Sequence, residues 1–136
     1  MKWVILDPSG NITAFVLTDT IPENKQEIAK SLLKQYLHVE QVGFLVPHKK
    51  ELIMAGGEFC GNAARAAVRR LLWGKIGETT LRISGYDKAV LGEIDKDNNV
   101  TITLWADFCY TISYEDQGFV IVYLQWITHM VVPVDE

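Results

Sequence analysis

The sequence has no surplus of basic residues. Among its 136 residues, 13 Lys and Arg stand against 17 Asp and Glu, so the formal net charge is -4. Proteins that bind the nucleic-acid backbone depend on clustered cations, so we expect no nucleic-acid partner. With 49% hydrophobic and 22% charged residues, the composition is typical of a globular domain with a buried core.

Long hydrophobic runs are also missing. The apolar stretch at residues 119–124 is far shorter than the roughly 20 residues that a membrane-spanning helix requires. The N-terminal segment reaches Asp7 before the apolar core of a signal peptide could form. We therefore expect a cytoplasmic protein without a membrane partner.

Cysteine and histidine are scarce and scattered. The sequence has two cysteines, Cys60 and Cys109, and three histidines, His38, His48 and His129, with no spacing typical of zinc ligands. We expect free thiols and no bound metal.

The first half of the chain alternates short strands with helices. Turn residues 8–11 separate strand-like runs at 3–6 and 13–17, which predicts a β-hairpin. Apolar residues at helical spacing predict an amphipathic helix over 23–36. A second hairpin is expected from residues 42–46 and 51–54, and an alanine-rich, largely buried helix from 61–73, ended by Gly74.

The second half is rich in strands. Six are expected, at residues 80–83, 89–94, 100–105, 109–114, 119–125 and 127–132. No linker or repeat divides the chain, so the sequence predicts one α+β domain over residues 1–136.

Cys60 is the residue with the most informative surroundings. It lies between a glycine-rich turn, Gly56-Gly57, and the start of the alanine-rich helix. Free backbone N–H groups and the positive end of the helix dipole would stabilise a thiolate there, and the same groups would accept a substrate carboxylate. A thiol beside a carboxylate site suits removal of a proton from the adjacent amino-acid Cα.

At this point the sequence resembles diaminopimelate epimerase and the related cofactor-independent amino-acid racemases. Residues 60–65, Cys-Gly-Asn-Ala-Ala-Arg, are similar to the family's Cys-Gly-Asn-Gly-Ala-Arg, and Gly10-Asn11 resembles its early Gly-Asn. Gln41 falls where the family has a substrate-facing glutamine. The order of predicted elements agrees across nearly the whole chain.

The resemblance implies both a fold and a mechanism. The fold would be a mixed, mostly antiparallel sheet curled around a central helix, one half of a two-domain enzyme that uses no metal or pyridoxal cofactor. Cys60 would be one acid/base, with Asn11, Gln41, Gly61 and Asn62 as substrate-binding residues. The chain resembles the first half only, and a second cysteine-bearing half has no counterpart in it.

Two departures from the family concern the substrate. Met54 and Ile127 stand where the family has asparagines that contact substrate. These replacements put in question whether diaminopimelate is the substrate. They have less effect on the chemistry expected at Cys60.

Simpler interpretations exist for several of these residues. Asn11 could supply a left-handed turn conformation, and Asn62 could serve only to start a helix. Arg65 is expected on a solvated or ion-paired helix face, and Cys109 is expected to be a packing residue of a strand.

Three hypotheses about function follow. The first is a cofactor-independent amino-acid racemase or epimerase, an isomerase that uses Cys60. The second is a non-catalytic module that binds an amino acid at Gly61 and Asn62. The third is a fragment of a longer enzyme, or a half-enzyme that needs a separate second-half chain. If the second half is missing, a homodimer could cover the face that carries Cys60 and bring two copies of Cys60 face to face across a two-fold axis.

Overall fold

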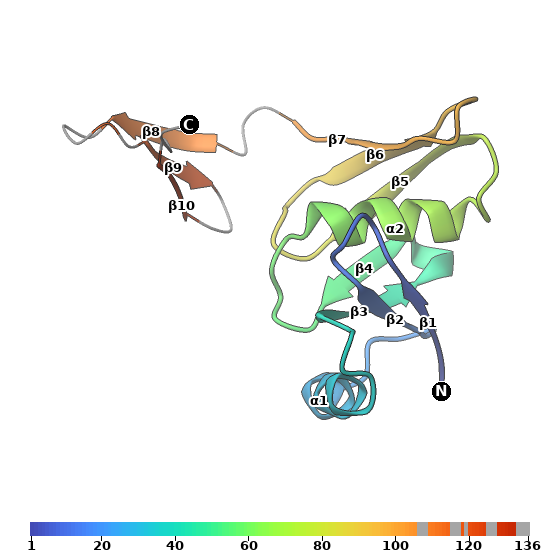
Figure 1. Cartoon of the computed structure of the whole chain (residues 1–136). Coiled ribbons are helices and arrows are strands. Elements are labelled where there is room, and N and C mark those ends of the chain that lie inside the picture. Colours follow the sequence, from blue (N-terminus) through green and yellow to red (C-terminus); the bar gives the residue numbers. More distant parts are fainter. Residues whose placement is uncertain (106–108, 115–117, 119, 125–127, 133–136) are drawn as a thin grey trace. The chain divides into compact units, whose positions relative to one another are not determined.

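The structure is a computed structural model, and it describes residues 1–105, 109–114, 118, 120–124 and 128–132 (Figure 1). These residues divide into two compact units, 1–103 and 104–136. The first unit contains β1 (Lys2–Leu6), β2 (Thr13–Leu17), α1 (Lys25–Gln35), β3 (Gln41–Val46), the 3-10 turn η1 (Pro47–Lys49), β4 (Glu51–Met54), α2 (Gly61–Leu71), β5 (Gly77–Ile83), β6 (Ala89–Ile94) and β7 (Val100–Thr103).

The first unit is built on one mixed sheet with the strand order β1-β2-β3-β4-β5-β6-β7. Two neighbouring pairs, β2·β3 and β4·β5, are parallel, and the other four are antiparallel. The sheet curls around α2, with β1 to β4 on one side of the helix and β5 to β7 on the other (Figure 1). The fold is therefore α+β, as the sequence predicted.

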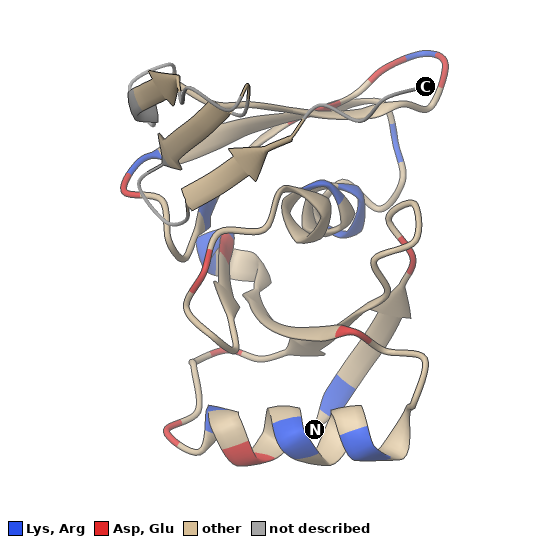
Figure 2. Cartoon of the chain, turned by 60° about the vertical axis from the view of Figure 1, so that its left-hand side comes forward, with Lys and Arg blue, Asp and Glu red and all other residues tan. Residues whose placement is uncertain are grey.

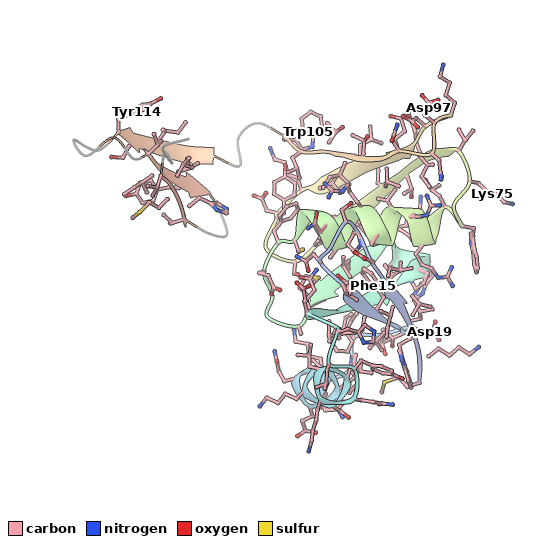
Figure 3. All side chains as sticks on the ribbon, in the orientation of Figure 1. Phe15, Asp19, Lys75, Asp97, Trp105 and Tyr114 are labelled. Atoms are coloured by element: carbon pink, nitrogen blue, oxygen red, sulfur yellow. The ribbon has the colours of Figure 1, made fainter. Side chains whose placement is uncertain are left out.

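Small residues allow α2 to lie inside this curl. Its alanines at positions 63, 64, 66 and 67 are almost fully buried. On β6, Gly92 faces Val68 so closely that an added Cβ would stand 2.2 Å from Val68 Cγ2. Phe15 on β2 is fully buried and fills the interior on the other side of the helix (Figure 3). The central helix is thus placed by close packing on both sides.

The helix α1 covers the outer face of the sheet instead. Its buried residues Ala29 and Leu32 pack in one apolar cluster with Ala14 and Val16 of β2 and with residues of β3. Its exposed residues include the charged side chains Glu27, Lys30 and Lys34 (Figure 2). This division into an apolar and a charged face explains the amphipathic pattern of the helix.

The second unit contains a three-stranded antiparallel sheet in the order β10-β9-β8. Its strands are β8 (Cys109–Tyr114), β9 (Val120–Leu124) and β10 (Thr128–Val131). Each matches a strand predicted from the sequence. The described residues form two compact units, so the single domain expected over residues 1–136 remains a prediction.

Most predicted elements are confirmed within two residues of their ends. The largest difference is β5, which begins at Gly77 rather than at residue 80 because residues 77–79 also pair with residues 92–94 of β6. None of the helices described by the structure is both long and apolar enough to span a bilayer.

Candidate active site

Cys60 is the N-cap residue of α2. Its backbone is extended, with φ -134° and ψ 110°, and its carbonyl accepts the N–H of Ala64 at 2.9 Å, the first turn of the helix. Its sulfur accepts the N–H of Ala63 at 3.4 Å, in the way that a serine oxygen caps a helix. The residue is half-buried and its thiol is free. The helix start expected from the sequence is therefore present at the thiol.

The loop that leads into Cys60 is held by the segment after β5. The hydroxyl of Ser84 donates to the carbonyl of Glu58 at 2.8 Å and accepts the N–H of Met54 at 2.9 Å. The rings of Phe59 and Tyr86 meet edge to face, with their centres 5.9 Å apart. The loop is fixed at both ends, so the position of the thiol is determined by strands on two sides.

The side chain of Gln41 contacts the thiol of Cys60. Its Nε2 donates to the sulfur of Cys60 at 3.3 Å and to the hydroxyl oxygen of Thr13 at 2.7 Å. The Thr13 hydroxyl in turn donates to the carbonyl oxygen of Asn11 at 3.0 Å. A chain of hydrogen bonds thus connects the β1–β2 turn, the start of β3 and the start of α2.

Gly61 and Asn62 form the first turn of α2, directly after the thiol. In the described part of the chain, neither backbone N–H has an acceptor in the protein, as expected for the first N–H groups of a helix. The side-chain oxygen of Asn62 accepts a hydrogen bond from Nη2 of Arg65. Arg65, predicted to lie on a solvated or ion-paired face, is half-buried and bonds to its own helix.

Asn11 lies at the end of the β1–β2 turn and is half-buried. Left-handed backbone occurs before it, at Ser9 (φ 67°) and Gly10 (φ 89°), and not at Asn11 itself. The interpretation of Asn11 as the left-handed turn residue is therefore wrong. Its side-chain amide makes no hydrogen bond to the described residues.

Thr13 is the member of this group that the sequence did not single out. It is fully buried and lies opposite Gln41 in the parallel pairing of β2 with β3. Thr13 is a β-branched residue in a strand, so strand propensity alone accounts for a threonine at this position. The only available signal was its position two residues after Asn11, on the face that also carries Phe15.

Of the two positions that depart from the diaminopimelate epimerase pattern, the structure describes one. Met54 is fully buried in β4, and its backbone N–H bonds to Ser84. Ile127 lies outside the described residues. Cys109 belongs to β8 in the second unit.

A pocket of about 500 Å³ lies elsewhere on the first unit. It is lined by Leu6, Asp7, Pro8, Ser9, Arg65, Ala66, Arg69, Asn98, Asn99 and Val100. None of the predicted site residues lines it. In the part of the chain that the structure describes, no three His, Cys, Asp or Glu side chains gather into a possible metal site.

Comparison with known proteins indicates a racemase family. The whole chain, residues 1–136, matches the family described as the histidine racemase CntK N-terminal domain, and the chain belongs to that family.

Two curated relatives share part of the sequence. They are histidine racemases from two strains of Fusobacterium nucleatum subsp. nucleatum, each 38% identical over 68 residues. The match covers 48% of this chain and 25% of each relative. The chain therefore spans only a minor part of the relatives it matches.

Proposed function

We propose that the chain is the Cys60-bearing half of a cofactor-independent amino-acid racemase, related in fold and mechanism to diaminopimelate epimerase. The observation that carries the proposal is the sulfur of Cys60, which accepts N–H groups from both Gln41 and Ala63 at the start of α2. Donors placed around the sulfur would hydrogen-bond to the thiolate, the form in which a cysteine acts as a base.

The proposed reaction begins with the substrate carboxylate on the free N–H groups of Gly61 and Asn62. The Cys60 thiolate takes the proton from Cα, and the electron pair left on carbon is delocalised into the carboxylate, where the same N–H groups stabilise the added charge. Return of a proton to Cα from the opposite face completes inversion. These steps need no metal or cofactor.

Histidine is the first substrate to test, because the family and both relatives are described as histidine racemases. Asn11 and Gln41 are the proposed side-chain contacts. The Oε1 atom of Gln41 has no partner in the described part of the chain and could accept a hydrogen bond from the substrate's ammonium group.

The second acid/base is proposed to come from outside the first unit. A two-base racemase needs a group on the other face of Cα, and among the described residues the hydrogen bonds to the sulfur of Cys60 come from Gln41 and Ala63, not from a thiol or a carboxyl group. A second-half domain or a second copy of this chain would supply that group and would also enclose the half-buried thiol. A single domain over residues 1–136 is part of the same proposal.

The test is loss of the Cα proton in D2O, followed by NMR. The chain is incubated under reducing conditions with histidine, glutamate, proline, hydroxyproline and diaminopimelate in turn. We expect exchange with histidine, no exchange with Cys60→Ala, and unchanged exchange with Cys109→Ser. One base is enough for exchange, so the test does not require the second half.

Binding of histidine without exchange would contradict the proposal and would support a non-catalytic amino-acid-binding module. The absence of both binding and exchange would also contradict it.

A further inference from the structure

We infer that Thr13 is a positioning residue, whose hydroxyl orients the Gln41 amide so that its NH2 group, and not its oxygen, faces the sulfur of Cys60. This inference rests on the proposed function in one respect only, that the thiolate of Cys60 serves as the catalytic base. The geometry itself comes from three hydrogen bonds, at 3.0, 2.7 and 3.3 Å, that join Asn11, Thr13, Gln41 and Cys60 in series.

The orientation follows from counting hydrogens. A threonine hydroxyl has one hydrogen, and Thr13 donates it to the Asn11 carbonyl, which can only accept. Towards Gln41 the hydroxyl oxygen can therefore act only as an acceptor. The Gln41 atom 2.7 Å away must carry hydrogens, so it is the amide nitrogen.

The second hydrogen of the same nitrogen then points to the sulfur. If the amide were turned over, its oxygen would face a Cys60 thiolate, which can only accept, and the Thr13 hydroxyl could donate to that oxygen only by giving up its hydrogen bond to the Asn11 carbonyl. Thr13 is 0% exposed, so water at its hydroxyl could not make up for these losses. Burial and the carbonyl of Asn11 together make one orientation of Gln41 strongly preferred.

The consequence for Cys60 is that its sulfur receives two donors, one from Gln41 and one from Ala63. A neutral thiol gains little from this arrangement because sulfur is a weak acceptor, whereas a thiolate gains a charge-assisted hydrogen bond from each donor. Thr13 thus acts on a thiolate at Cys60 without touching the sulfur. It does so through Gln41, which gives the inference a specific test.

The test measures the rate at which iodoacetamide alkylates Cys60, followed by peptide mass spectrometry so that Cys109 does not interfere. Thr13→Val keeps the shape of the side chain and removes the hydroxyl. We expect alkylation at pH 7 to slow about tenfold, on the scale of one hydrogen bond to a charged group. At high pH, where the thiol is ionised in both proteins, the two rates should be equal.

Controls separate positioning from general damage. Thr13→Ser restores the hydroxyl and should react like the wild type. Thr79→Val removes another buried hydroxyl, which donates to the Thr80 carbonyl, and should also leave the rate unchanged.

A double-mutant cycle tests the route through Gln41. Gln41→Met removes the amide and should slow alkylation at pH 7 by itself. The Thr13→Val substitution should have no further effect in that background, because its path to the sulfur is already absent. An additive effect would overturn the inference, as would wild-type rates for Thr13→Val across the pH range.

Two further results decide the remaining cases. If Thr13→Val does not fold, a wild-type alkylation rate in Gln41→Met overturns it. Alkylation requires no substrate, so the expected alkylation pattern without any Cα exchange would uphold this inference while contradicting the proposed function.

Discussion

Gly85 lies against the backbone of Phe59, the residue that precedes the thiol. A Cβ added at Gly85 would stand 2.3 Å from the backbone nitrogen of Phe59, and the φ of Gly85 is +75°. Both the space and the conformation thus exclude a side chain. The position of Cys60 depends on this contact, because Phe59 is the last residue before the helix cap.

Substitution Gly85→Ala should therefore disturb the site as well as the stability. The clash is with backbone, which cannot rotate away, so we expect the free energy of unfolding to fall by about 2 kcal/mol or more. Urea denaturation measures this loss. Cα exchange with histidine should decrease too, because the loop carrying Cys60 must shift.

Gly57→Ala is the matched control for this substitution. Gly57 has a similar φ of +79° but no atom within 4 Å of an added Cβ. Only the left-handed conformation is penalised there, by about 1 kcal/mol. Equal losses in the two variants would show that the contact between Gly85 and Phe59 does not matter.

The close approach of α2 to β6 gives a second prediction. Gly92→Ala would place a methyl group 2.2 Å from Val68 Cγ2, so we expect a loss of about 1–3 kcal/mol from overpacking. Val68→Ala alone should also destabilise, because it leaves a cavity. The double variant should be more stable than the sum of the single losses implies, since each change makes room for the other. Additive losses by urea denaturation would argue against direct packing.

Asp95 gives a prediction about pH. Hydrogen bonds from the Asn99 side chain and backbone, and from the backbone of Asp97, hold the pKa of this carboxyl below its ordinary value. A carboxyl with a lowered folded-state pKa stabilises the protein above its unfolded-state pKa and loses that contribution as the pH falls through the folded-state value. Asp95→Ala should therefore lower the melting temperature at pH 7 and have a smaller effect in strong acid. A pH-independent difference between the two proteins would contradict this account.

The carboxylate of the substrate is predicted to be essential for exchange. Histidinamide keeps the imidazole and the amino group but has no negative charge for the N–H groups of Gly61 and Asn62. We expect its Cα exchange to be at least about tenfold slower than that of histidine, on the scale of one lost charge-assisted interaction. NMR of the two compounds side by side measures the ratio, and equal rates would place the carboxylate elsewhere.

Local patterns were enough to predict the elements of the fold. Turn residues between β-branched runs predicted the first hairpin, and the alanine-rich segment after Cys60 predicted the buried helix at its observed start. The same patterns carry no information about which strands pair as neighbours. The parallel pairs β2·β3 and β4·β5 join segments separated by a helix, so their register depends on packing across the sheet.

The site was predictable only in part for the same reason. Cys60 could be recognised from its neighbours in sequence, because a helix start is a local feature. Its contact with Gln41, 19 residues earlier, and the contact of Gln41 with Thr13 depend on the pairing of β2 with β3. Thr13 could not be distinguished from an ordinary strand residue until that register was known.

The central claim is that Cys60 removes the Cα proton of an amino acid, and exchange measured separately on L- and D-histidine in D2O tests it most directly. We expect the chain to exchange the Cα proton of at least one enantiomer and Cys60→Ser to exchange neither. Exchange of one enantiomer with retained configuration would indicate that the second acid/base belongs to another domain, and inversion of both would indicate a second copy of Cys60. No exchange by the wild-type chain, or equal exchange by Cys60→Ser, would contradict the claim.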